Sequence, residues 1–164
     1  MEQHVIAAEL SAAGAQELLA ATSSAHLAYN AEDGTPRVIP VGFFWTGTQF
    51  VISTATTSPK VAALKARPDA ALTIDGGDTP EQARALSVRG RASIEIVDGL
   101  VPEYIAAARK SMGVEAAAEF EEACRAMYEQ MARIAITPSW VRFYDFGAGR
   151  MPRFLAELVN RDRP

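Results

Sequence analysis

The sequence has few of the residues that build metal sites and disulfide frameworks. It contains one cysteine, Cys124, and two histidines, His4 and His26, among 164 residues. A single cysteine cannot form an intrachain disulfide, and neither an HExxH nor a CxxC spacing is present, so we expect no metal site. The same scarcity of cysteine favours a reducing compartment, and we therefore expect a cytoplasmic protein.

Long apolar runs and an excess of positive charge are also missing. No run approaches the roughly 18 apolar residues that cross a bilayer, and an acidic flank replaces the basic start of an export signal. The chain has 16 Lys and Arg against 20 Asp and Glu, a formal net charge of -4. We therefore expect no membrane partner, no export and no nucleic-acid partner.

The composition is that of an ordinary folded protein. Hydrophobic residues make up 49% of the chain and charged residues 22%, which excludes a disordered or fibrous protein. At about 150 residues per domain, the length predicts one domain over residues 1–164.

The first half of the chain predicts antiparallel strands. Apolar runs at 25–29 and 37–45 flank an Asp33-Gly34 turn and predict a hairpin, which a third run at 49–54 extends. From Val38 to Trp45 the apolar residues do not alternate with polar ones, so both faces of this strand need cover. A subunit, a planar ligand or a helix would supply it. Pro40 points to an edge, a bulge or a place where a ligand approaches.

The remaining periodicities predict helices and further strands. Ser11 is expected to cap a helix over 11–20, and Ser58-Pro59 to begin another that ends before Arg67-Pro68. The other expected elements are, in chain order, a strand over 70–74, a half-buried strand over 86–96 in which Gly90 marks a bulge or close backbone contact, one or two helices over 101–131 broken near Gly113, two strands over 133–137 and 140–146 joined by Pro138-Ser139, and a short terminal helix that begins at Pro152.

No side chain stands out as catalytic. Cys124 shares a helical stripe with Phe120, Met127 and Met131, which indicates a small buried hydrophobe rather than a nucleophile. His26 lies in an apolar strand, which is typical of a structural histidine, and no GxSxG motif accompanies it. We therefore assign no catalytic residue from the sequence.

The segment from Ser53 to Lys60 has the composition of a phosphate-binding loop. A strand ends among hydroxyl side chains and leads into a capped helix, whose free N–H groups and dipole favour an anion next to a lysine. A plain capped helix with an exposed lysine is the alternative explanation.

Several motifs in order resemble the pyridoxamine 5'-phosphate oxidase-like, flavin-binding split β-barrel family. They are the Gly34-x-Pro36 and Pro40-Val41 strand, the aromatic run after it, the Ser53-Thr54 strand end, the Ser58-x-Lys60 helix start and Arg67-Pro68-Asp69 before a strand of small residues. The resemblance covers about residues 20 to 95. It implies a mainly β fold, a six- to seven-stranded antiparallel split β-barrel with peripheral helices, assembled as a homodimer with two cofactors at the interface.

The resemblance also implies which residues contact the cofactor, either FMN or the 8-hydroxy-5-deazaflavin coenzyme. Val38, Ile39, Pro40 and Val41 would lie along its ring, Ser53 and Thr54 near the ribityl chain, and Ser58 and Lys60 at the phosphate. The acidic tail of the deazaflavin would need further cations, and Arg37, Arg89 and Arg91 are the candidates. Arg89 and Arg91 also fit the solvent face of an alternating strand.

Two departures from the oxidases of this family point to its deazaflavin-dependent reductases. Pro59 stands where the oxidases have an arginine, and the tail 146–151 lacks their arginine- and histidine-bearing segment, whereas 140–145 resembles the reductases. We therefore expect a reductase of a small, conjugated organic substrate. The alternative is a non-catalytic binder of flavin, haem or another tetrapyrrole, with His26 as the haem ligand.

Overall fold

The computed structural model describes residues 1–161, which form seven strands and six helices. Their bounds, in chain order, are α1 Gln3–Ser11, α2 Ala13–Ala21, β1 Ser24–Asn30, β2 Pro36–Gly42, β3 Phe44–Trp45, β4 Phe50–Ala55, α3 Pro59–Ala66, β5 Asp69–Gly76, β6 Arg84–Asp98, α4 Pro102–Met112, α5 Val114–Met127, β7 Gln130–Asp145 and α6 Arg153–Arg161. No helix among these is long and apolar enough to cross a membrane.

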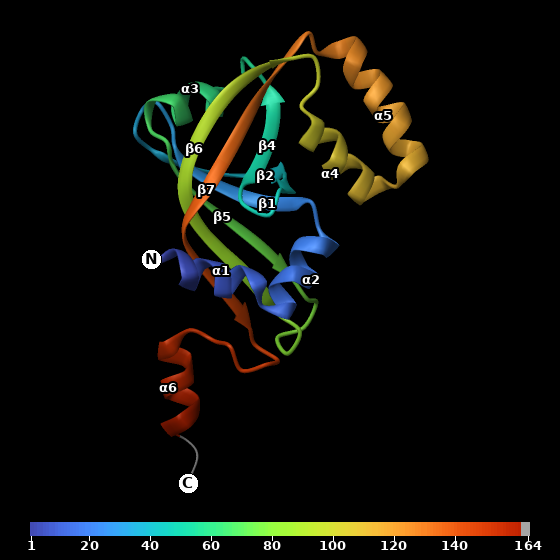
Figure 1. The fold of residues 1–164 in the computed structure, drawn as a ribbon. Coiled ribbons are helices and arrows are strands. Elements are labelled where there is room, and N and C mark those ends of the chain that lie inside the picture. Colours follow the sequence, from blue (N-terminus) through green and yellow to red (C-terminus); the bar gives the residue numbers. More distant parts are fainter. Residues whose placement is uncertain (162–164) are drawn as a thin grey trace.

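The strands form one antiparallel sheet in the order β2-β1-β5-β6-β7-β4-β3. The sheet curls so that β2 also contacts β4, which lies near its other end. Figure 1 shows the long strands β6 and β7 wrapping around the others, with helices at the periphery. The expected mainly β, antiparallel split barrel is confirmed, and Pro40 lies on the edge strand β2, where its missing N–H costs no ladder bond.

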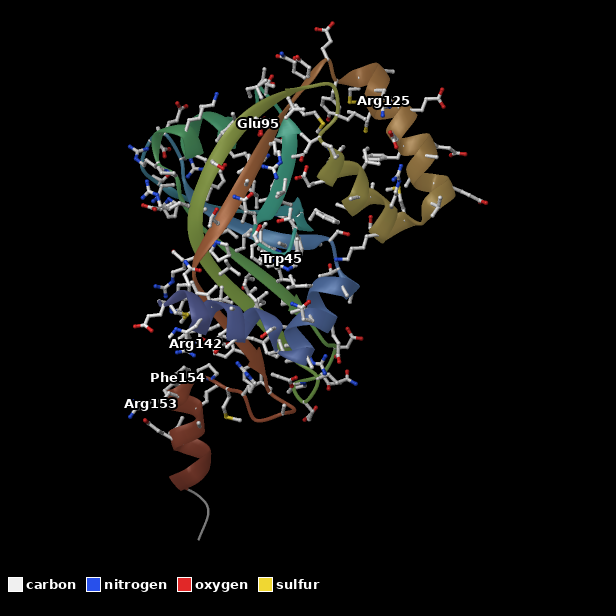
Figure 2. The ribbon with its side chains drawn as sticks, viewed as in Figure 1. Trp45, Glu95, Arg125, Arg142, Arg153 and Phe154 are labelled. Atoms are coloured by element: carbon white, nitrogen blue, oxygen red, sulfur yellow. The ribbon has the colours of Figure 1, made fainter. Side chains whose placement is uncertain are left out.

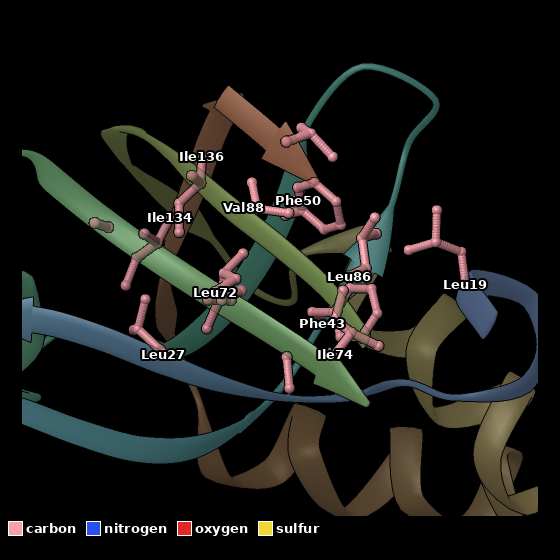
Figure 3. Packing of buried hydrophobic residues seen from close by; sticks show 14 of the residues in the cluster. Leu19, Leu27, Phe43, Phe50, Leu72, Ile74, Leu86, Val88, Ile134 and Ile136 are labelled. Atoms are coloured by element: carbon pink, nitrogen blue, oxygen red, sulfur yellow. The ribbon is translucent and has the colours of Figure 1, made fainter. Parts of the chain in front are cut away.

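Side chains from alternate positions of the strands fill the barrel. Leu27, Phe50, Leu72, Leu86 and Ile134 come from five different strands, and each is no more than 2% exposed. Figure 3 shows them converging between the strands. Burial of this apolar surface is the main source of stability in such a fold.

The two longest strands bend together at Gly90 and Pro138. The pairing of β6 with β7 shifts between Arg89 and Gly90, which leaves Ser139 as the extra residue of a bulge. A Cβ atom on Gly90 would lie 2.3 Å from the Thr137 carbonyl oxygen, so only glycine fits this close approach. The bulge predicted at Gly90 is confirmed, but 133–137 and 140–146 are parts of one bent strand rather than two strands.

Helices cover different parts of the barrel. Val61 and Leu64 of α3 pack into the main core, whereas α4 and α5 form a hairpin beside β4 (Figure 1). Under this hairpin, Val51 and Met131 belong to a second buried cluster. The break at Gly113 is confirmed, but Met131 lies in β7 and not in the predicted helical stripe, because α5 ends at Met127.

The N-terminal residues form two helices where the pattern predicted one over 11–20. Ser11 is the last residue of α1, and its hydroxyl donates to the Ala8 carbonyl oxygen instead of capping α2. Helix α1 is joined to β7 by hydrogen bonds to the carboxylate of Glu9, which is 8% exposed.

At the other end of the chain, α6 follows Pro152 as predicted, and its first turn carries Arg153 and Phe154 (Figure 2).

Candidate functional site

The side chains of β2 divide between the two faces of the sheet. Ile39 and Val41 pack against the core, whereas Val38 is 66% exposed and Pro40 is exposed on the other face. The strand is therefore apolar on both faces, as its sequence indicated, and its outer face has no cover within the described chain.

A hollow of about 380 Å³ lies on this outer face, between β1, β2, β5, β6 and β7. We call it the outer hollow; His26, Val38, Arg89, Trp140 and Tyr144 line it. The Arg89 guanidinium stacks over the Trp140 ring, 4.4 Å from the ring centroid. The Asp75 carboxylate lies 3.7 Å from His26 Nδ1. The outer hollow thus combines an aromatic surface with a cation and a histidine.

The three candidate arginines differ in their partners. Arg37 pairs with Asp33 at 3.1 Å, and Arg91 pairs with Asp69 at 3.2 Å. Arg89 forms no ion pair with a carboxylate of residues 1–161. Of the three, Arg89 therefore has its charge available for an anionic ligand.

The start of α3 brings together Ser58 and Lys60. The Lys60 ammonium donates to Ser58 Oγ at 2.9 Å, and the Ser58 side chain forms no capping hydrogen bond with the helix. The first turn of α3 contains no acidic residue, and Lys60 has no ion pair within the described part of the chain. Burial lowers the pKa of Lys60. This half-buried, unbalanced cation beside a hydroxyl fits a phosphate group.

A second hollow, of about 440 Å³, separates α4 from the sheet. We call it the α4 hollow, and its walls come from the ends of α2 and β2, from β4 and from α4 and α5. Its main lining side chains are Phe43, Val51, Ser53, Tyr104, Lys110 and Phe120.

The charged groups of the α4 hollow are one ion pair and one separate lysine. Glu103 accepts two hydrogen bonds from Arg133, at 2.6 and 3.0 Å, and this guanidinium lowers the pKa of Glu103. Lys110 donates to the carbonyl oxygens of Leu19 and Thr22, next to the end of α2. It has no carboxylate partner within residues 1–161.

Several hydroxyl side chains line the α4 hollow, among them Ser53 and Tyr104. Ser53 Oγ is the buried side-chain oxygen that lacks a hydrogen-bond partner among the described residues. Tyr104 stacks against Phe120 with ring centroids 5.5 Å apart. Burial, together with the neighbouring Cys124 and Tyr128, raises the pKa of Tyr104 to about 12. This phenol is therefore protonated at neutral pH and can donate a hydrogen bond.

Residues 12–145 match the family described as Pyridoxamine 5'-phosphate oxidase. The chain belongs to this family. The match extends well beyond the 20–95 segment on which the sequence resemblance rested, and it includes α4, α5 and β7. No curated protein sequence matches the chain.

Solved structures share the fold of this pyridoxamine 5'-phosphate oxidase family member. A conserved hypothetical protein, Rv2991 from Mycobacterium tuberculosis, is 18% identical with a TM-score of 0.65, over 93% of this chain and 90% of its own. An F420 reductase is 25% identical with a TM-score of 0.57, over 77% and 94%. The haem storage protein HutZ from Vibrio cholerae is 14% identical with a TM-score of 0.56, over 76% and 87%.

In a single chain, the residues predicted to contact the cofactor do not line one common hollow. Val38 and Arg89 line the outer hollow, Ser58 and Lys60 meet at α3, and Ser53 lines the α4 hollow. Ile39 and Val41 face the core, while Pro40 lies on the outer face and Thr54 is half-buried near the end of β4. All nine remain predictions.

The sequence did not indicate the α4 hollow. Its walls join residues as distant in the chain as Ser53 and Lys110, and the alanine-rich helix α4 carries no motif. No local signal could have found it, because the proximity of Lys110 to the Phe43 ring exists only in the folded chain. Lys110 lies 5.7 Å from the Phe43 ring centroid.

Proposed function

We propose that this protein is an oxidoreductase that uses FMN or the 8-hydroxy-5-deazaflavin coenzyme, acting as a reductase of a small conjugated organic substrate. The observation that carries the proposal is the Lys60-Ser58 pair at the start of α3, a cation without an acidic partner among residues 1–161, on the framework of a flavin-binding family. Residues 1–164 would form one cofactor-binding domain.

The residues present fit a flavin-type group. Lys60 and Ser58 would hold its phosphate, and β2 would lie along its ring. Thr54 would lie near the ribityl chain with the Ser53 hydroxyl, which has no hydrogen-bond partner in the part of the chain that the structure describes. When bound, the cofactor supplies the hydride, and the protein contributes binding, orientation and exclusion of water. This division of labour agrees with the lack of a catalytic side chain in the sequence.

A homodimer with a cofactor at each interface is part of the proposal. The exposed apolar face of β2, with Val38 at 66% exposure, supports it because a second copy would cover this face. Arg89 on the same side of the sheet is available for the negative charges of a deazaflavin tail.

Replacement of Lys60 tests the anchor. We expect Lys60→Ala to weaken cofactor binding by about 1.5 to 3 kcal/mol, the scale of a hydrogen bond to a charged group, without loss of the fold. Titration of the apo-protein with FMN and with the deazaflavin coenzyme measures this change. Lys65→Ala is the matched control, because Lys65 is exposed in the last turn of the same helix. Unchanged affinity of Lys60→Ala for both cofactors would contradict the assignment of the phosphate site to Lys60.

An acceptor assay tests the direction of the reaction. We expect reduced deazaflavin or reduced FMN to be oxidised in the presence of the protein and a quinone or conjugated enone. The cofactor is followed by absorbance, and pyridoxamine 5'-phosphate under air is the comparison. Oxidation of the vitamin with release of peroxide, and no turnover of the acceptors, would make the protein an oxidase instead.

A non-catalytic binder of flavin, haem or another tetrapyrrole is the second candidate. His26 favours it, since its exposed imidazole lies in the outer hollow with Asp75 near Nδ1, and a carboxylate at this nitrogen commonly orients a histidine ligand. The neighbour HutZ is described as a haem storage protein. An absorbance spectrum of the purified protein identifies the bound group, because a tetrapyrrole such as haem gives a Soret band that neither FMN nor the deazaflavin gives, and His26→Ala should abolish the haem band. If the bound group is a flavin, the acceptor assay separates a binder from an enzyme.

A further inference from the structure

The α4 hollow has the size and the walls of a small-molecule site. Its volume of about 440 Å³ falls within the range of ligand pockets, and one wall is a helix hairpin rather than the sheet. The small residues Ala107 and Ala108 on α4 leave room opposite Val51 and Ser53 on β4. The hollow is therefore a space between the helix hairpin and strand β4.

Aromatic side chains give the α4 hollow an apolar lining suited to a flat molecule. Phe43 is 1% exposed and forms part of the barrel core, while Tyr104 and Phe120 stack on each other on the helix side. The Tyr104 and Phe120 rings on the helix side favour a planar guest, because rings pack well in offset or tilted stacks.

The balance of charge in the α4 hollow favours an anion. Glu103 is neutralised by Arg133 at 2.6 Å, which leaves Lys110 as the charge without an opposite partner among residues 1–161. Lys110 spends two of its three donors on the Leu19 and Thr22 carbonyls, so a third remains for a ligand. Burial also lowers the pKa of Lys110, the signature of a cation without a compensating carboxylate.

Ser53 links the α4 hollow to the proposed cofactor site. Its Oγ is buried without a hydrogen-bond partner among the described residues, and the same residue is the expected neighbour of the ribityl chain. Rotation of the Ser53 hydroxyl offers a hydrogen bond to a molecule in the hollow. A ligand there would thus lie beside the cofactor.

We infer that the α4 hollow is the substrate pocket and that it selects a flat, apolar molecule with a carboxylate, which Lys110 binds. The identification of the bound acid as a substrate rests on the proposed function. The binding of such acids to the hollow is a property of this chain and is testable without any cofactor.

Calorimetric titration with a matched pair of probes tests the inference. We use 2-naphthoate and its neutral analogue 2-naphthamide on the full-length protein as purified, and again after FMN is added. We expect naphthoate to bind about tenfold more tightly than naphthamide, since one charge-assisted hydrogen bond corresponds to about this ratio. Lys110→Gln should remove the preference and leave naphthamide binding within about twofold.

Three variants serve as controls. Lys65→Gln removes an exposed lysine outside the hollow and should keep the preference. Ala107→Trp fills the hollow and should abolish binding of both probes. Lys110→Arg keeps the charge and should retain the preference, which separates loss of charge from loss of the contacts to α2. Circular dichroism establishes that each variant is folded.

The outcomes separate this inference from the proposed function. Equal affinity for the two probes, no binding of either, or a preference that survives Lys110→Gln would overturn the pocket assignment. If the wild-type protein binds naphthoate as expected but not FMN or the deazaflavin, the acid site stands and the proposed function fails. If FMN binds and the acid preference is missing, the pocket assignment fails and the proposed cofactor binding stands.

Discussion

At the scale of single residues, ion pairs contribute unequally to stability because they differ in burial. Glu103 and Arg133 are about four-fifths buried, with 19% and 20% exposure, whereas Asp69 and Arg91 are 78% and 69% exposed. Water screens the second pair and little of the first. The effect of losing one carboxylate should therefore depend strongly on which pair it belongs to.

Glu103→Gln should lower the free energy of unfolding by about 2 kcal/mol at pH 7, because Arg133 loses a charged partner in a mostly buried place. Since Arg133 lowers the pKa of Glu103 in the folded protein, the stabilisation is complete above the ordinary value of 4.5 and is lost as the pH falls below it. Urea unfolding between pH 3 and pH 7 measures the difference between variant and wild type.

The surface pair provides the reference for that measurement. Asp69→Asn should change stability by no more than about 0.5 kcal/mol at pH 7. A constant difference between Glu103→Gln and the wild type across the whole pH range would contradict an electrostatic origin.

At the scale of elements, α1 is fastened to β7 through one carboxylate. Glu9 receives the Phe143 N–H at 2.8 Å, Arg142 at 3.0 Å and Arg150 at 2.7 Å. The chain therefore joins its N-terminal helix to its last strand by a buried acid with three donors. The packing of Ile6 and Leu10 into the core adds to this attachment.

Glu9→Gln should destabilise the protein by about 2 to 3 kcal/mol, since the amide keeps the shape but leaves Arg142 and Arg150 without their acid. Chemical unfolding measures the loss. Glu157→Gln is the matched control: its bond to Arg153 is also 2.7 Å, but Arg153 is 93% exposed, and the expected change is below about 0.5 kcal/mol. Equal effects of the two variants would show that burial is not the deciding factor.

Elements with a strong period were predictable and those without one were not. Alternation identified β6, and Ser58-Pro59 identified the start of α3. Helix α1 was missed because no side chain caps its start and its buried face includes the charged Glu9 beside Ile6 and Leu10. The break assigned at Pro138 was wrong because a bulge opposite Gly90 lets one strand continue through the bend, which depends on the partner strand and cannot be inferred locally.

At the scale of the whole molecule, the described chain leaves apolar groups uncovered on two sides. Val38 is exposed on β2, and Phe154 and Leu158 of α6 are 63% and 52% exposed. Figure 1 shows α6 standing apart from the barrel. Exposed apolar surface of this kind commonly marks an interface.

We expect a homodimer that persists at micromolar concentration. Light scattering coupled to size exclusion should give about twice the chain mass of 17.6 kDa. Val38→Glu places a charge on the outer face of β2 and should shift the species toward the monomer, whereas Glu32→Gln at the exposed β1–β2 turn should not. If the wild-type protein is a monomer, the interface proposed for the cofactor does not exist.

The family was predictable from the sequence, whereas the relation between its parts was not. Local motifs such as Ser58-x-Lys60 carry the resemblance, and the family match confirms it. The α4 hollow depends on the packing of α4 against β4, and the position of Arg89 over Trp140 depends on the register of β6 with β7. Contacts of this kind are set by the folded barrel as a whole.

The bulge at Gly90 and Pro138 divides the long β6–β7 ladder into two arms. One arm, around Arg142 and Phe143, is clamped by Glu9, and the other, around Met131 and Ala135, lies beneath α4 and α5. Because an irregularity interrupts the hydrogen-bond ladder between them, we expect the two arms to behave as distinct units in amide-proton exchange. Departure of the α4–α5 hairpin would then expose the amides of one arm while those of the other stay protected.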